Sequence, residues 1–412
     1  MKKLTIALGV LVLVAAALPA RAASPISGEI VLAPENNHLN AYSVETGERF
    51  RVITSAHEDP AGGRDINGQI CFDPSNDGRF VAGEDTGQGG NGVAGWGYFE
   101  LTADSDDGIA ADQIGKLAPA YLGTPDNHGC GFLSDGSLVT ATIGNVYPGE
   151  PANGELILWF RDSDGGFAQG YTTGGRDGLD TNTPFGTVPY CKLATDLATA
   201  GGVWVEGNDV YVAVNRPQGG DDGNPLGGEP GGVRKFSLAT VPSLNGDGSI
   251  TGCHQVTIDD QATGAPVTEW WVDDGTVTSE QLLTDLQVGF VNGMAATPSG
   301  IVASDHDTFY VSSVFTGTIT EVDRDGHFVR PILVPGEGVA VDGAITPFGL
   351  GLDSNGDLWV ADLGIVAVAP APTFGSIVKI PIDDAGLPGI PVAIDTGLTY
   401  PDGLGIASIT LG

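Results

Sequence analysis

The segment Phe348-Gly-Leu-Gly-Leu-Asp-Ser-Asn-Gly-Asp-Leu-Trp-Val-Ala-Asp362 carries the clearest structural pattern in this chain. Two short apolar runs flank a polar turn that contains Asn-Gly, which is the pattern of a β-hairpin. A third strand of the same kind, Gly375-Ser-Ile-Val-Lys-Ile-Pro381, follows. Such short strands bury their apolar faces only when further units pack against them, so the pattern predicts copies elsewhere in the chain.

Copies of the stretch recur about every 60 residues. They begin at Asn67, His128, Cys191, Asn292, Phe348 and Asp402, at intervals of 61, 63, 101, 56 and 54 residues. Four short strands per unit at this spacing are typical of propeller blades, whereas a β-sandwich would not repeat its sequence pattern. The 64 Gly and 26 Pro among 412 residues also favour many short strands joined by turns. We therefore predict an all-β fold, a six-bladed β-propeller with four-stranded blades.

The two ends of the chain complement each other. The last copy, which begins at Asp402, has room for an inner strand only, and residues 29–34 and 38–43 supply outer strands without an inner one. We predict that these segments share one blade, which closes the ring and removes a sheet edge. The 101-residue interval leaves a seventh blade open as the alternative, but residues 278–285 predict a short helix in a loop.

The N-terminus has the three parts of a secretory signal peptide. Lys2-Lys3 is basic, residues 4–18 are apolar, and Ala20-Arg-Ala22 is a small-x-small cleavage site. The alternative is a membrane anchor, but about 15 apolar residues are few for spanning a bilayer. We predict a signal peptide over 1–22, a mature single propeller domain over 23–412, a periplasmic or secreted location and no membrane insertion.

The four cysteines are an even number, which suits disulfides in an exported protein. They are Cys71, Cys130, Cys191 and Cys253, and four cysteines allow three pairings. We favour Cys71–Cys130 together with Cys191–Cys253; four buried free thiols are the alternative. Metal binding by these cysteines is disfavoured because the chain has no C-x-x-C.

The charge of the chain is mostly acidic. Lys and Arg number 17 against 52 Asp and Glu, which gives a formal net charge of −35. Such an anion repels phosphate, so nucleic acid and anionic membranes are poor partners. We expect a monomer whose substrate is a small molecule, such as a saccharide or a lactone.

Three phrases resemble blades of the SMP-30/gluconolactonase-like, NHL-type propellers: residues 348–362, Asn292-Gly-Met and Asp402-Gly-Leu-Gly-Ile. The resemblance covers blade cores along most of residues 27–412. It implies a divalent cation on the propeller axis, often Ca²⁺, held by a Glu, two Asn-type ligands and an Asp. Asn292 and Asp402 match two of those positions. The Glu-x-Pro segment with which the family opens is missing before an inner strand.

In a four-stranded blade, the loop that enters the inner strand and the loop that leaves the second strand open on the same face, near the axis. The carboxylates and amides at these positions are the hard oxygen donors that Ca²⁺ takes six to eight at a time. The predicted metal ligands are Asn292, Asp402, Asn67 and Glu84. The predicted catalytic residues are His128, Asp362 and Asp85, and the predicted substrate-binding residues are Asn215 and Arg216. Asn-Gly and Asp-Gly are also ordinary turn sequences, because glycine readily adopts a positive φ.

The sequence favours an exported, metal-dependent hydrolase of lactone or ester type at the axial funnel. Calcium would polarise the carbonyl, and His128, Asp362 or Asp85 would take a proton from water. The alternatives are a lyase that uses the same groups and a non-catalytic propeller for binding or assembly. An open funnel would favour the enzyme, and a funnel plugged by Phe348 and Trp96 would favour the binding module. Loops typical of a functional face are predicted at 86–124, 145–186, 217–231 and 239–290.

Overall fold

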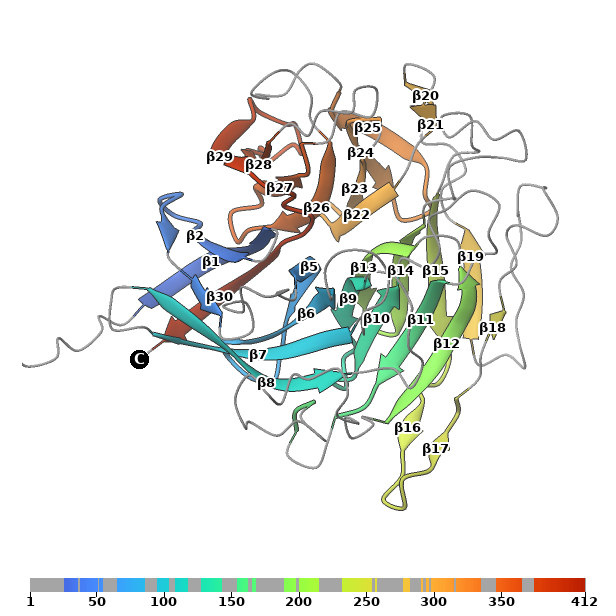
Figure 1. The fold of residues 1–412 in the computed structure, drawn as a ribbon. Helices are drawn as coiled ribbons and strands as arrows, with labels where there is room; N and C mark the ends of the chain where they lie inside the picture. The colour runs from blue at the N-terminus through green and yellow to red at the C-terminus, as the bar shows by residue number, and fades with distance from the viewer. Residues whose placement is uncertain are drawn as a thin grey trace, which may run out of the picture.

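The computed structural model shows a ring of antiparallel blades around one axis (Figure 1). The structure describes residues 26–35, 38–50, 52–54, 65–85, 95–103, 108–117, 127–142, 154–161, 165–167, 189–197, 200–214, 232–253, 256–257, 277–281, 290–291, 294–295, 298–314, 316–334, 346–364 and 374–411. These residues form six antiparallel four-stranded blades, which confirms the predicted six-bladed propeller, and the described strands contain no seventh blade. The described part of the chain contains no helix, and so no helix that could cross a membrane.

Each blade runs outward from an inner strand. Blade 1 consists of β30 (Gly405–Leu411), β1 (Ile26–Glu35), β2 (His38–Ser43) and β3 (Arg49–Phe50). Blade 2 consists of β5 (Asp65–Phe72), β6 (Arg79–Asp85), β7 (Gly95–Ala103) and β8 (Ile109–Leu117), with β4 (Val52–Thr54) parallel to β8. Blade 3 consists of β9 (Asn127–Phe132), β10 (Leu138–Thr142), β11 (Gly154–Trp159) and β12 (Tyr190–Leu197), with β18 (Val256–Thr257) parallel to β12.

The other three blades follow the same pattern. Blade 4 consists of β13 (Ala200–Glu206), β14 (Asp209–Val214), β15 (Gly232–Leu238) and β19 (Val277–Gln281). Blade 5 consists of β22 (Pro298–Ala303), β23 (Thr308–Ser313), β24 (Thr318–Asp323) and β25 (Phe328–Leu333). Blade 6 consists of β26 (Pro347–Leu352), β27 (Leu358–Asp362), β28 (Gly375–Ile380) and β29 (Val392–Leu398). Two small hairpins lie outside the blades, β16 (Ser243–Leu244) with β17 (Ile250–Thr251) and β20 (Phe290–Val291) with β21 (Met294–Ala295).

The first and last strands close the ring, as the sequence predicts. β30 is the inner strand of blade 1, and it pairs antiparallel with β1 from Ile26↔Leu411 to Leu32↔Gly405. Both predicted disulfides are present as well, Cys71–Cys130 and Cys191–Cys253.

The inner strands of blades 4 and 5 begin later than predicted. The copy assigned to Cys191 lies in β12, the last of the four antiparallel strands of blade 3, and the inner strand of blade 4 begins at Ala200. The copy assigned to Asn292 also precedes its inner strand, which begins at Pro298. A short apolar run with a turn residue fits several strands of a blade, so the local pattern alone does not select the inner one.

The short helix predicted over residues 278–285 is wrong for the described part of this segment, because Val277–Gln281 forms strand β19 of blade 4. Strands also lie inside the predicted long loops: β7 and β8 within 86–124, β11 within 145–186, and β16 to β19 within 239–290. Outer strands have one solvated face, so their polar residues resemble loop sequence.

Glycine allows the inner strands to approach one another closely around the axis. A Cβ on Gly129 would overlap the carbonyl oxygen of Gly201, one on Gly300 would overlap that of Phe348, and one on Gly403 would overlap that of Gly68. Of these glycines only Gly68 has a positive φ, 72°. Most of these glycines therefore serve the close packing of neighbouring backbones. Only Gly68 has the positive φ that the sequence interpretation as turn glycines requires.

Candidate functional site

The inner strands share a two-residue pattern at the end of the axis where they begin, which we call the proximal end. In each blade one residue stands ahead of a glycine, at the start of the inner strand or just before it. The pairs are Asp402-Gly403, Asn67-Gly68, His128-Gly129, Gly201-Gly202, Ser299-Gly300 and Phe348-Gly349, for blades 1 to 6 in order. We call the six leading residues the proximal ring.

Two members of the proximal ring meet across the axis. His128 belongs to blade 3 and Phe348 to blade 6, which is the opposite blade, and their ring centroids lie 4.2 Å apart in an edge-on arrangement. The His128 side chain is buried, and neither Nδ1 nor Nε2 has a hydrogen-bond partner among the described residues. Burial lowers the pKa of His128 to about 3, because the charged imidazolium would lose its hydration. His128 is therefore neutral at physiological pH.

Phe348 is held by its backbone, although its side chain is partly exposed. The Ser312 hydroxyl donates to the Phe348 carbonyl oxygen at 2.7 Å and accepts from the Gly300 N–H at 2.8 Å. These bonds link blades 5 and 6. The Phe348 carbonyl is therefore anchored to blade 5.

Asn67 and Asp402 lie on neighbouring blades 2 and 1. The Gly68 N–H donates to Asp402 Oδ1 at 3.0 Å, which places the carboxylate beside the start of the bulged strand β5. The Asn67 Oδ1 atom is buried and accepts no hydrogen bond within the described structure. Of the residues predicted from the sequence, the fold thus brings Asn67, Asp402 and His128 to one end of the axis, as members of the same ring.

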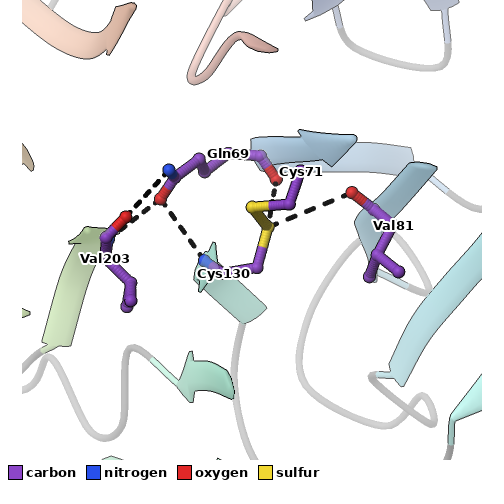
Figure 2. The surroundings of a disulfide bond; sticks show 5 residues. All are labelled: Gln69, Cys71, Val81, Cys130 and Val203. Atoms are coloured by element: carbon purple, nitrogen blue, oxygen red, sulfur yellow. Dashed lines mark hydrogen bonds between the residues drawn. A yellow bond between two sulfur atoms is a disulfide. The ribbon is translucent and has the colours of Figure 1, made fainter. Parts of the chain in front are cut away.

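A second layer of contacts crosses the axis below this ring. Figure 2 shows the Gln69 side chain reaching from blade 2 to blade 4, where its amide bonds both the N–H and the carbonyl of Val203 at 2.9 Å. Gln69 Oε1 also accepts from the Cys130 N–H of blade 3 at 3.3 Å. The Cys71–Cys130 disulfide joins the inner strands β5 and β9 at the same place. Sequence reasoning assigned no role to Gln69.

Asp362 lies at the end of β27, and its carboxylate accepts four hydrogen bonds within blade 6. The donors are Thr346 N–H at 2.6 Å, Thr346 Oγ1 at 3.0 Å, Ser376 Oγ at 3.2 Å and Gly364 N–H at 3.3 Å. Burial raises the pKa of Asp362, although these hydrogen bonds oppose the shift. The contacts give Asp362 a structural task, because they fix the ends of the segments that flank β27.

The other predicted residues are only partly placed. Glu84 and Asp85 end strand β6, but their side chains lie outside the described structure, as do Asn215, Arg216 and Asn292 entirely. Trp96 is buried in β7, the third strand of blade 2, and therefore does not plug the axis. The sequence analysis also missed Ser299, although the shared pattern Pro-x-Gly at Pro298, Pro347 and Pro401 would have found it.

The described residues of the proximal ring supply few oxygen ligands for calcium. Asn67, Ser299 and Asp402 carry side-chain oxygens, whereas His128, Phe348 and Gly201 occupy the other three positions. Calcium takes six to eight oxygen ligands, so this set does not form a calcium site by itself. The one described group of three His, Cys, Asp or Glu side chains within reach of a common ion is Asp323, Asp325 and His327, at the exposed turn between β24 and β25.

No protein-family model and no curated protein matches the sequence. Solved structures do resemble the fold. A protein of unknown function from Bacteroides caccae has a TM-score of 0.46 and 10% identity, with 92% of this chain and 99% of that chain covered. The periplasmic gluconolactonase of Pseudomonas aeruginosa has a TM-score of 0.44 and 12% identity, with 94% and 100% covered.

A third similar structure is a calcium-binding protein, regucalcin, from Agrobacterium tumefaciens. It has a TM-score of 0.42 and 12% identity, with 91% of this chain and 95% of that chain covered. At such identities the likeness is one of fold, and site residues cannot be carried over. The fold that the sequence resemblance implies, a six-bladed β-propeller, is present in this chain.

Proposed function

We propose that the protein is an exported, monomeric hydrolase that opens a lactone or another ester at the proximal end of its axis. The observation that carries the proposal is the buried, neutral His128, whose two ring nitrogens have no partner among the described residues. An imidazole without a partner is available to a water molecule or a substrate. Asp402 and Asn67 add polar groups to the same ring.

The chemistry requires His128 to be neutral and in contact with water. Burial holds its pKa at about 3 while the Phe348 ring covers it, and entry of water raises the pKa towards its usual value because the charged form is hydrated again. The imidazole then accepts a proton from water while the water oxygen attacks the carbonyl carbon. The tetrahedral intermediate then collapses, the ester C–O bond breaks, and the proton on His128 passes to the leaving oxygen. A substrate reaches His128 when the Phe348 ring, which packs against the imidazole, turns aside.

The test uses a panel of γ- and δ-lactones and p-nitrophenyl esters with the mature protein. His128→Gln should lower kcat/KM by about 100-fold or more, since general base catalysis contributes roughly 10²–10⁴-fold. His306→Gln, a change at an exposed histidine in blade 5, is the control and should leave kcat/KM unchanged. Full activity in His128→Gln, or no turnover of any substrate, would contradict the proposal.

Calcium at the axis is a separate part of the proposal. It depends on Asn292 and the side chain of Glu84 completing the oxygen set that Asn67 and Asp402 begin. Elemental analysis of the mature protein, dialysed without chelator, should give about one calcium per chain, and Asp402→Ala should lose it. Equal calcium in both proteins would place any ion elsewhere, for which Asp323 and Asp325 provide the alternative.

Export rests on the N-terminal pattern and on the two disulfides, which form in oxidising compartments. Mass spectrometry of the protein from the periplasm or medium should give a chain that begins at Ala23. An uncleaved chain in the cytoplasm would contradict export without touching the hydrolase chemistry.

A non-catalytic binding module is the second candidate, and one observation favours it. The His128–Phe348 contact and the Gln69 side chain both cross the axis and leave less room for a substrate there. Phe348→Ala separates the candidates. It should raise the activity of a gated hydrolase towards bulky esters, whereas a binding module would stay inactive in both forms.

A further inference from the structure

The side-chain amide of Gln69 joins the inner strands of three blades (Figure 2). Its Nε2 atom donates to the Val203 carbonyl oxygen at 2.9 Å, and its Oε1 atom accepts from the N–H groups of Val203 at 2.9 Å and Cys130 at 3.3 Å. Gln69 belongs to β5 of blade 2, Cys130 to β9 of blade 3 and Val203 to β13 of blade 4. One amide therefore makes three hydrogen bonds to two other blades.

These bonds pair backbone groups at the free edges of the inner strands. An inner strand has a neighbouring strand on one side only, so the N–H and carbonyl groups of its other edge need other partners. Val203 and Cys130 are completely buried, where a polar group without a partner is costly. The register of β5 shifts between Asn67 and Cys71, and a bulge of this kind re-aims a side chain. The Gln69 amide thus takes the place of a neighbouring peptide group beside Val203.

The backbone on both sides of Gln69 is bonded to the segment that leads into blade 1. The Gly68 N–H donates to Asp402 Oδ1 at 3.0 Å, and the Ile70 N–H donates to the Leu404 carbonyl oxygen at 3.3 Å. Gln69 is therefore fixed at its base, and its side chain passes that position on to blades 3 and 4. Blades 1 to 4 are connected around this one residue.

The connection lies beside His128. Cys130 is two residues beyond His128 on β9, which is roughly 7 Å along an extended strand. The residue between them, Gly129, packs so closely on β13 that a Cβ would overlap the carbonyl oxygen of Gly201. The disulfide at Cys130 ties β9 to β5 but not to β13, whereas Gln69 bonds both β9 and β13. The place of the imidazole relative to blade 4 therefore depends on Gln69.

We propose that Gln69 is a positioning residue for His128: its hydrogen bonds hold β5, β9 and β13 together and keep water out of the layer below the imidazole. Without the amide, two N–H groups and one carbonyl group lose their partner, and water enters to bond them. A cavity of about 630 Å³, lined in part by Gln69, Cys130 and Val203, supplies that water. The imidazole is then hydrated from below and loses its alignment with a substrate. The kinetic part of this inference rests on the proposed hydrolase, and the structural part does not.

The first test needs no activity: it is the rate at which diethyl pyrocarbonate modifies His128 in the mature protein, followed by mass mapping. Gln69→Met keeps the length of the side chain but removes the amide, and the entering water should raise the rate at least about five-fold. Gln69→Asn, whose amide is one methylene too short to span the strands, should raise it at least about three-fold and decides the test where Gln69→Met does not fold. A wild-type rate in the folded variant overturns the proposal.

A matched control separates positioning from the loss of any buried amide. Gln113 is a second buried glutamine of blade 2, in the outer strand β8, and it donates to the Gly115 carbonyl oxygen of the same strand at 3.4 Å. Gln113→Met should change the modification rate of His128 less than two-fold. Equal increases in Gln69→Met and Gln113→Met would assign the effect to general loosening of the blade and overturn the proposal.

The second test is kinetic and uses a lactone or ester that the wild-type protein hydrolyses. Gln69→Met should lower kcat at least about ten-fold with KM changed less than about three-fold, since a misplacement of about 1 Å costs on the order of 100-fold in rate. Gln113→Met should keep kcat within two-fold. An unchanged kcat in Gln69→Met, or equal losses in both variants, would leave Gln69 a stabilising role only and overturn the proposal. If the wild type turns over no substrate, the hydrolase proposal fails, and the modification rate alone decides the role of Gln69.

Discussion

Replacing Arg161 by Met should destabilise the protein by about 3–5 kcal/mol, because it leaves a buried carboxylate without its cation. Arg161 follows β11 of blade 3 and donates to Asp73 of blade 2 at 2.7 and 2.6 Å. The Asp73 side chain is completely buried, and that of Arg161 is 15% exposed. Methionine keeps an unbranched apolar stem beside Phe132 and Phe167, whose rings Arg161 covers, so the loss is mainly one of charge.

The magnitude follows from what remains around Asp73. Tyr98 still donates at 2.7 Å and the Ser75 N–H at 2.8 Å, so the carboxylate keeps hydrogen bonds but loses its cation. Burial alone would raise the pKa of Asp73, yet the bonds from Arg161, Tyr98 and Asn76 lower it overall. Stability from this group is therefore present above the unfolded pKa and is lost as the pH falls through the lowered folded pKa.

Thermal unfolding measures the effect at pH 7. Unfolding entropy for about 400 residues is on the order of 0.8 kcal/mol/K, so a loss of about 4 kcal/mol lowers the Tm by about 5 °C. Arg49→Met is the matched control: it breaks a pair with Asp395, again between two blades, but Arg49 is 48% exposed. Exposed pairs contribute about 0–1 kcal/mol. Equal Tm shifts in the two variants would refute the burial argument.

Two further predictions concern pH and reductant. His128→Gln should flatten the pH dependence of stability. The pKa of His128 is about 3 in the folded protein, against 6.5 for an unperturbed histidine, which stands for the unfolded chain. The native protein therefore loses about 1.4 kcal/mol per pH unit as the pH falls from 6.5 towards 3. Urea unfolding at pH 4, 5 and 6 checks this, and parallel slopes would contradict it. A reductant should open Cys191–Cys253 before Cys71–Cys130, because Cys253 is exposed whereas Cys71 and Cys130 are buried. Each bridge closes a loop of about 60 residues, worth about 4 kcal/mol in the chain-entropy picture, and alkylation with mass mapping gives the order; simultaneous opening would contradict it.

The sequence predicted the blades well because each blade is a local unit. A hairpin with Asn-Gly at its turn and a third strand after it repeats in the sequence, so the number of blades and the closure by β1 and β30 could be inferred. The pairing Cys71–Cys130 agrees with the same period, since these residues lie 59 apart on neighbouring inner strands. Such features depend on neighbours along the chain or one blade away.

The candidate site was harder to predict because it forms between blades that are distant in sequence. The repeat predicts where each inner strand lies within its own blade, but not which residues of opposite inner strands face each other across the axis. The contact of His128 with Phe348, 220 residues further along the chain, depends on that alignment. The same holds for Gln69, which bonds Cys130 of the neighbouring blade 3 and also reaches Val203 of blade 4. No pattern within one copy carries this information.

The narrow axis explains why side chains of opposite blades meet in this propeller. Glycines without a Cβ let each inner strand touch the next, so side chains from opposite blades, such as His128 and Phe348, reach each other. The Gln69 amide crosses the axis a second time, from blade 2 to blade 4. The Phe348 ring therefore covers the imidazole from the opposite side of the axis. Phe348→Ala should speed the modification of His128 by diethyl pyrocarbonate, followed by mass mapping, and an unchanged rate would show that Phe348 does not limit access to His128.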